Sequence, residues 1–206
     1  MIKRMDDVIE EVYVEGRFKV KVGNKVVARG RNKWTRYFAS TIVEHVIHSQ
    51  VNHGGPKYND THIFGIANNA TARVGKDTTT PTDPSMTDLV QKEDVAPSSF
   101  NRVLEKNDAM TEYRSKYIFQ WDTGVLPNMT IGEFGIYGLL GSDAWSSPLT
   151  NPNPYTYLPY NNRQTLSSEA STRLMARISS GDGDFTPIDY TNTKVLKLEW
   201  VVIVSG

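Results

Sequence analysis

Hydrophobic and polar residues alternate along several segments of the chain. Residues 17–22 place three apolar side chains on one face and three basic ones on the other: Phe18, Val20 and Val22 against Arg17, Lys19 and Lys21. A period of two with one apolar face predicts a half-buried β-strand. Gly23 and Asn24 then predict a tight hairpin turn, because glycine adopts a positive φ at little steric cost, and residues 25–28 form the predicted return strand.

The same periodicity predicts strands farther along the chain. In the clearest of them, residues 112–121, four aromatic side chains share one face: Tyr113, Tyr117, Phe119 and Trp121. Further strands are predicted at 100–104, 130–140, 173–179 and 194–204. The last of these is apolar on both faces, which predicts a central strand covered on both sides. Residues 68–88 are rich in Thr, Asn, Asp and Pro and predict an extended loop.

One segment has the periodicity of a helix. Between residues 34 and 49, apolar side chains recur at steps of three and four, which lines them along one side of an α-helix. About eight to ten strands, one amphipathic helix and long loops predict a mainly β fold, an antiparallel β-sandwich of jelly-roll-like type. At 206 residues the chain is predicted to form one such domain, residues 1–206.

The charge balance limits the expected partners. Lys and Arg total 23 and Asp and Glu total 23, so the formal net charge is zero. Binding to a polyphosphate chain needs a surplus of basic groups, so we expect no nucleic-acid partner. No apolar run approaches the ~20 residues of a membrane span and no apolar signal segment is present, so we expect no membrane partner and folding in the cytoplasm. The absence of cysteine excludes disulfides, thiolate nucleophiles and cysteine-based zinc sites.

Residues 142–163 differ in kind from the rest of the chain. Four prolines exclude a helix or a sheet-interior strand, so an extended Pro/Tyr-rich arm is predicted. The arm has few charges and four aromatic residues, the composition of an interface core: Trp145, Tyr155, Tyr157 and Tyr160. We therefore predict that the arm contacts another protein chain. Packing on the protein's own core and stacking on a glycan are the alternatives.

Two groups of residues have metal-binding chemistry. The four histidines fall within one stretch of sequence and offer imidazole ligands for zinc or nickel: His45, His48, His53 and His62. Solvated histidines at a helix end are the favoured interpretation. Asp182 and Asp184 offer oxygen ligands for calcium, but a calcium loop needs further ligands, so a hairpin turn whose aspartates bond the backbone is favoured. We expect no metal and no cofactor.

Glu133 is the one carboxylate inside a strongly apolar run. In such a place it would act as a general acid with a raised pKa, or as a structural glutamate that accepts hydrogen bonds from backbone or arginine; the second interpretation is favoured. The sequence contains no nucleophile elbow, HExxH motif, phosphate loop or dinucleotide-binding motif. We therefore expect no catalytic residues and a protein that is not an enzyme.

Two motifs carry a resemblance to a known family. The first is the E-x-G-I-Y segment, residues 133–137, and the second is the DGDFTPI turn, residues 182–188. With the order of the other elements, they make residues 25–206 resemble small virion proteins of tailed phages and related archaeal viruses, of the tail-fibre, tail-collar or head-decoration type. The resemblance gives a structural role to Glu133, Gly135, Tyr137, Asp182 and Asp184. The arm at 142–163 departs from it, because such proteins usually make a short turn there.

The resemblance implies a non-enzymatic structural component on the exterior of a tailed virus particle, as a capsid decoration or turret or as a tail, collar or fibre-attachment protein. The implied location is the virion, assembled in the host cytoplasm. The implied partners are further copies of the chain, in a trimer or higher ring, and the major capsid, collar or tail proteins. The alternative is a carbohydrate-binding, receptor-binding β-sandwich that holds a host-surface glycan on the Trp/Tyr segment.

Overall fold

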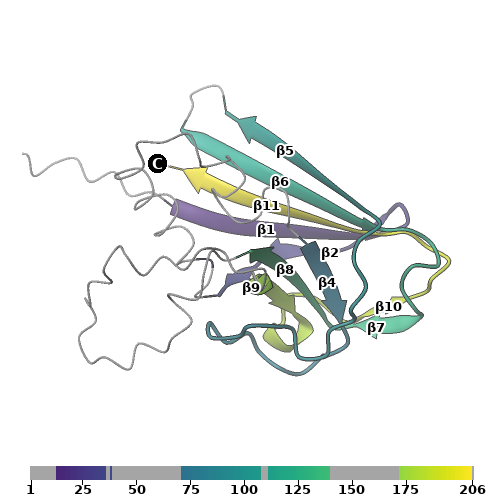
Figure 1. Ribbon diagram of the computed structural model, residues 1–206. Helices are drawn as coiled ribbons and strands as arrows, with labels where there is room; N and C mark the ends of the chain where they lie inside the picture. The colour runs from purple at the N-terminus through teal and green to yellow at the C-terminus, as the bar shows by residue number, and fades with distance from the viewer. Residues whose placement is uncertain (1–12, 36–37, 39–70, 108–110, 140–171, 206) are drawn as a thin grey trace, which may run out of the picture.

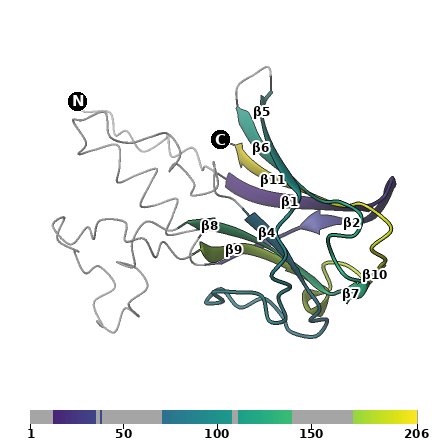
Figure 2. The same cartoon turned by 45° about the vertical axis from the view of Figure 1, so that its right-hand side comes forward.

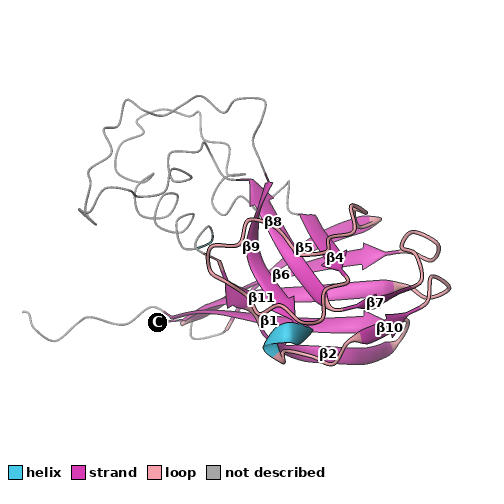
Figure 3. Ribbon diagram, turned by 90° about the horizontal axis from the view of Figure 1, so that it is seen from below, coloured by secondary structure: helices cyan, strands magenta, loops and turns pink. Residues whose placement is uncertain are grey.

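The computed structural model describes residues 13–35, 38, 71–107, 111–139 and 172–205 (Figure 1). Every strand pairing in this part of the chain is antiparallel, and the one helical element described is the 3-10 turn η5 (Ser180–Asp182) (Figure 3). The strands, in chain order, are β1 (Tyr13–Val22), β2 (Lys25–Arg31), β3 (Lys33–Trp34), β4 (Thr71–Gly75), β5 (Ser99–Lys106), β6 (Glu112–Trp121), β7 (Met129–Ile131), β8 (Glu133–Leu139), β9 (Thr172–Ser179), β10 (Ile188–Tyr190) and β11 (Leu196–Ser205).

The strands form two main layers. A five-stranded sheet has the order β2-β1-β11-β6-β5, and a four-stranded sheet has the order β3-β9-β8-β4. The short pair β10-β7 lies at one end of the two layers (Figure 2). One hydrophobic core joins the layers, with Phe119 and Trp200 from the first sheet and Phe134 and Ile178 from the second. The predicted mainly β, antiparallel class is confirmed, and the two sheets pack face to face.

Strand β11 holds the middle of the five-stranded sheet. It pairs with β1 and β6 in unbroken register over its full length, so segments from the two ends of the described chain lie side by side. Leu196, Leu198 and Trp200 face the core and are fully buried. The central position predicted from the apolar run at 194–204 is confirmed, but the predicted cover on both sides is not found in the described residues, because Glu199 and Val201 line an open hollow on the outer face. The alternation predicted for residues 17–22 is confirmed too, because Phe18 and Val20 are buried.

Three expectations differ from the structure. Residues 68–88 are not loop throughout, because β4 lies within them; Ala72 and Val74 are buried, but this short alternation is hidden among polar neighbours. The predicted strand 130–140 is split by Gly132 into β7 and β8. The helix predicted over 34–49 lies almost entirely outside the described residues, and its expected first residue, Trp34, ends strand β3 instead.

A loop covers the outer face of the four-stranded sheet. Residues 76–93, here the 76–93 loop, connect β4 toward β5 and pass over β8 and β9 (Figure 1). The backbone N–H of Leu174 on β9 donates to the carbonyl of Thr87 at 3.1 Å. A second apolar cluster fills the space beneath the loop: Leu89, Tyr137, Leu174 and the partly buried Met86. The four-stranded sheet is therefore covered on both faces.

Gly132 lies at a close contact between this loop and the sheet. Its N–H donates to the carbonyl of Gly75 at 3.0 Å, and an added Cβ would collide with the backbone carbonyl of Asp77. Because the nearest clashing group, the Asp77 carbonyl, belongs to the backbone, we expect Gly132→Ala to lower the free energy of unfolding by about 1–3 kcal/mol. Urea unfolding measures this. Gly30→Ala is the control; its Cβ would lie 3.0 Å from the Phe18 ring and 3.8 Å from the Asp184 carbonyl, so a smaller loss is expected. Equal losses of unfolding free energy in the two variants would contradict the close approach of the loop backbone to Gly132.

Candidate functional site

Alternate residues of β8 face the 76–93 loop. Phe134 lies in the main core, whereas Glu133, Gly135 and Tyr137 lie on the opposite face. Gly135 leaves room for the loop, because an added Cβ would come within 3.0 Å of the Leu89 side chain. Since strand residues two apart share a face, the E-x-G-I-Y motif is one side of one strand, fitted to the loop that covers it.

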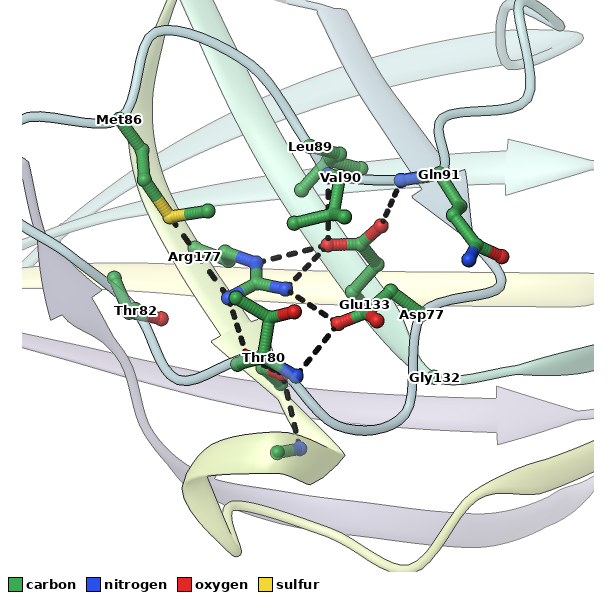
Figure 4. Close-up of polar contacts among 12 residues, drawn as sticks. Asp77, Thr80, Thr82, Met86, Leu89, Val90, Gln91, Gly132, Glu133 and Arg177 are labelled. Atoms are coloured by element: carbon green, nitrogen blue, oxygen red, sulfur yellow. Dashed lines mark hydrogen bonds and ion pairs between the residues drawn. The ribbon is translucent and has the colours of Figure 1, made fainter.

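Glu133 is completely buried and fully engaged (Figure 4). Its Oε2 accepts hydrogen bonds from Arg177 Nε at 2.9 Å and Nη2 at 2.6 Å. The backbone N–H groups of Gln91 and Val90 in the loop donate to the same carboxylate at 2.9 and 3.3 Å. This is the arrangement of a structural glutamate, the interpretation favoured from the sequence, because arginine and backbone N–H groups both stabilise the buried charge.

Arg177 connects the same carboxylate to a second part of the loop. The side chain comes from β9 and is fully buried. Its Nη1 donates to the carbonyl of Thr80 at 2.9 Å, and its Nη2 lies 3.4 Å from Asp77 Oδ2. Asp77 in turn accepts the backbone N–H of Thr80 at 2.9 Å. The guanidinium group thus joins β9 to β8 and to the start of the loop, and the Glu133 carboxylate binds the end of the loop. We call this arrangement the Glu133–Arg177 clamp (Figure 4).

The DGDFTPI turn fastens the loop at another point. Asp182 accepts the backbone N–H of Thr82 at 3.0 Å and its hydroxyl at 2.5 Å, and also pairs with Lys33 of β3. Asp184 accepts the backbone N–H of Ser179 at 3.0 Å. Gly183 has a φ of 77°, the left-handed conformation that ends η5. The turn predicted from the sequence is present, but Asp182 bonds the distant loop rather than its own backbone.

Tyr137 is the third point of attachment. Its hydroxyl donates to the Asp88 carboxylate and accepts the backbone N–H of Leu89 at 3.1 Å. Burial, with the neighbouring Asp88 carboxylate, raises the pKa of the Tyr137 hydroxyl well above its usual range. The phenol therefore stays protonated and keeps donating. Lys92 pairs with Asp88 at 2.7 Å across the same contact.

In the described part of the chain, the five-stranded sheet has an open edge and an uncovered outer face. The outer face carries charged residues and a broad hollow. Strand β5 forms one edge of the sheet and pairs only with β6 among the described strands (Figure 2). All eight residues of β5 are exposed. On its inner side an apolar hollow of about 210 Å³ adjoins the strand, lined among others by Leu104, Tyr113, Tyr117 and Val204. Leu104 is 70% exposed, and Tyr113 is 50% exposed.

An exposed strand edge beside exposed apolar side chains is able to bind another chain. Backbone N–H and C=O groups on the open side of an edge strand can pair with a further strand, and large apolar side chains next to them add buried area. We therefore take β5 and the adjoining apolar hollow as the candidate interaction surface. The strand predicted at 100–104 lies within β5, but the edge position of β5 depends on sheet order, which no local pattern encodes.

Several residues singled out from the sequence lie outside the described part of the chain. These are the arm residues and the histidines: Trp145, Tyr155, Tyr157, Tyr160, His45, His48, His53 and His62. Within the described ranges, no group of three or more His, Cys, Asp or Glu side chains is placed to hold a metal ion. No helix in those same ranges is long and apolar enough to cross a membrane.

Comparison of the chain with protein-family models, with curated proteins and with solved structures gives no match. The resemblance to virion proteins of tailed viruses therefore stays a prediction from the motifs. What the structure adds is the physical role of those motifs. Glu133, Tyr137 and Asp182 fasten the 76–93 loop, and Asp184 fastens the turn beside it.

Removing Arg177 should be costly. Arg177→Met keeps an unbranched side chain of similar length but leaves the Glu133 carboxylate buried without its cation. We expect the free energy of unfolding to fall by about 3–5 kcal/mol, the usual loss when one partner of a buried pair is removed. Arg114→Met removes a surface pair with Glu112 and should cost less than about 1 kcal/mol. Chemical denaturation measures both, and similar losses in the two variants would refute the buried clamp.

Asp182 should make the stability depend on acid. Burial alone would raise the pKa of its carboxyl, but hydrogen bonds from Lys33 and Thr82 outweigh burial and hold the pKa below its usual value. Because the folded pKa is the lower one, ionised Asp182 stabilises the fold above the unfolded pKa of about 3.9, and this contribution is lost as pH falls through the folded pKa.

We therefore expect the difference in unfolding free energy between wild type and Asp182→Asn to shrink as the pH falls from neutral to acidic values. At neutral pH the variant should be the less stable protein. Asp94→Asn is the control, because Asp94 is 82% exposed and its variant should follow the wild-type curve. A constant gap between wild type and Asp182→Asn at all pH values would show that the carboxylate charge does not contribute.

Proposed function

We propose that the protein is a non-enzymatic structural component of a tailed virus particle and that it acts by oligomerisation and protein–protein contact on the virion exterior. The observation that carries the proposal is the exposed edge strand β5 with its adjoining apolar hollow. The resemblance of residues 133–137 and 182–188 to capsid-decoration, collar and tail proteins supplies the biological setting. Both point to assembly with other protein chains.

The two edges of the five-stranded sheet differ in how open they are to pairing. At the β2 edge the register with β1 shifts at a bulge, and the strand carries three basic residues and no acidic one. At the β5 edge eight residues pair with β6 without a shift, Phe100, Val103 and Leu104 remain exposed, and the charges on the strand are of both signs: Arg102, Glu105 and Lys106. Bulges and repeated like charges protect edges against further pairing, whereas long flat apolar edges favour it. This contrast supports β5 as the assembly edge.

The predicted arm at 142–163 has a place in the same proposal. Trp145, Tyr155, Tyr157 and Tyr160 would supply a second interface with a neighbouring copy or another virion protein, and their residues lie outside the described chain. The glycan-binding alternative uses the same aromatic residues. A trimer or higher ring, built in the host cytoplasm and carried on the virion, remains our prediction for the assembled form.

Leu104→Lys tests the assembly edge. Leu104 is 70% exposed, so the fold should tolerate lysine, but a charge on the edge should hinder strand pairing. We expect sedimentation velocity at micromolar concentration to show an oligomer for the wild type and at least a tenfold larger dissociation constant for the variant. Circular dichroism should give the same spectrum for both.

Val26→Lys is the matched control on the protected edge. Val26 lies on β2 and is 42% exposed, and its replacement should leave the oligomer unchanged. A wild-type protein that stays monomeric and does not assemble on capsid, collar or tail proteins would overturn the proposed function. An oligomer that both variants leave intact would locate its interface away from β5.

A further inference from the structure

The outer face of the five-stranded sheet is strongly basic although the whole chain is neutral. The strand registers place twelve charged side chains on this face. Eight are basic: Arg17, Lys19, Lys21, Arg29, Arg31, Arg114, Lys116 and Lys197. Four are acidic: Glu15, Glu105, Glu112 and Glu199. The face therefore carries a surplus of four positive charges, which neutrality of the full sequence conceals.

The centre of this face is hollowed. A depression of about 490 Å³ has Val201 in its lining and six basic side chains around it, with Glu105 and Glu199 between them. We call it the basic hollow; its basic residues are Arg17, Lys19, Arg29, Arg31, Arg114 and Lys116. An apolar residue among cations is suited to a ligand that has both carboxylates and apolar groups.

Part of the positive charge is already balanced within the face. Lys19 and Lys21 both pair with Glu199, at 2.5 and 2.9 Å. Burial alone would raise the pKa of the Glu199 carboxyl, but hydrogen bonds from the two lysines outweigh it and keep the pKa below its usual value. Arg29 and Lys116 have no ion pair with any described residue. These two cations are therefore the ones most available to a ligand.

The side chains that line the hollow favour a protein ligand over a nucleic acid. No aromatic side chain lines the hollow except Phe18, whose ring belongs to the core, and Glu105 and Glu199 interrupt the series of cations. Single-stranded nucleic acids bind proteins mainly through stacking on exposed aromatic rings and a continuous positive groove. Arginines around an apolar centre are instead typical of protein interfaces.

The chain itself contains a segment with the complementary chemistry. Residues 6–12 read DDVIEEV, four carboxylates and three β-branched apolar side chains without a basic residue. We infer that this acidic N-terminal segment of one copy docks in the basic hollow of a second copy. The inference rests on the proposed function, because it names a second contact of the same assembly.

Docking between two copies is favoured over docking within one copy. The acidic segment comes directly before Tyr13, the first residue of β1. The hollow lies farther along β1, around Arg17 and around Val201 of the neighbouring strand β11. To reach its own hollow the segment would have to reverse direction just before β1. Residues 8–13 contain no glycine, proline, asparagine or aspartate, the residues that reverse turns favour. A contact between unlike surfaces of two copies is heterologous and generates rings or filaments.

The first experiment measures binding of the acidic segment alone. A labelled synthetic peptide of residues 1–12 is titrated into the full chain carrying Asp6→Asn, Asp7→Asn, Glu10→Gln and Glu11→Gln, so that its own segment does not compete. We expect saturable binding that weakens at least tenfold when Arg29→Glu and Lys116→Glu are added. The matched control is Lys25→Glu with Lys194→Glu, which changes the net charge equally but lies outside the hollow, and it should change binding less than threefold.

A peptide of residues 1–12 in which the four carboxylates are replaced by amides should not bind. A labelled single-stranded oligonucleotide of twelve nucleotides should bind more weakly than the acidic peptide. Tighter binding of the oligonucleotide would overturn the choice of a protein ligand. Equal weakening by both pairs of charge reversals would overturn the hollow as the site.

The second experiment separates this inference from the proposed function. Sedimentation velocity should show that the four neutralising substitutions weaken self-association of the full chain and that the effect depends on protein concentration. If Leu104→Lys dissociates the oligomer but the four substitutions do not alter it, the proposed function stands and the docking inference is wrong. If the wild type never self-associates, docking between copies is wrong, whereas the proposed function fails only if the wild type also does not assemble on capsid, collar or tail proteins.

Discussion

The second layer of the fold depends on the buried ion pair between Glu133 and Arg177. Two charges removed from water are unfavourable unless each hydrogen-bonding position is filled, and neither strand supplies enough partners. The missing partners come from the 76–93 loop: N–H groups of Val90 and Gln91 for the carboxylate, and the carbonyl of Thr80 for the guanidinium. The loop without regular structure and the charged pair therefore stabilise each other.

The same constraint makes the two faces of the sandwich unlike. The clamp, the Tyr137 contact and the Asp182 contact all bring the loop onto the four-stranded sheet, where polar groups are paired and Leu89 and Leu174 are buried. On the five-stranded sheet the outer face has charged side chains and a hollow, and β5 has an open edge. The outer face of the four-stranded sheet is thus covered by the loop, whereas in the described chain the outer face and the β5 edge of the five-stranded sheet stay accessible.

The sequence predicts the regular parts of this structure well because their signal is local. The alternation in β6 and β11 arises from neighbouring residues, so the strands and their buried faces were predictable. β4 was missed because its two buried residues, Ala72 and Val74, are small and few. The partner of Glu133 was not predictable in identity, since Arg177 is 44 residues away and meets it only when β8 pairs with β9. The basic hollow likewise needs the sheet order, because its cations come from β1, β2 and β6.

The motif residues that carry the resemblance to virion proteins lie inside the fold. Glu133, Gly135, Tyr137 and Asp182 all face the loop, so in this chain they stabilise the fold rather than form a partner surface. Proteins that share them are expected to share the covered four-stranded layer, whereas fold alone does not fix function. Residues that choose a partner must lie where the motifs do not reach. In the described chain the surfaces that we propose for this role are the β5 edge and the basic hollow.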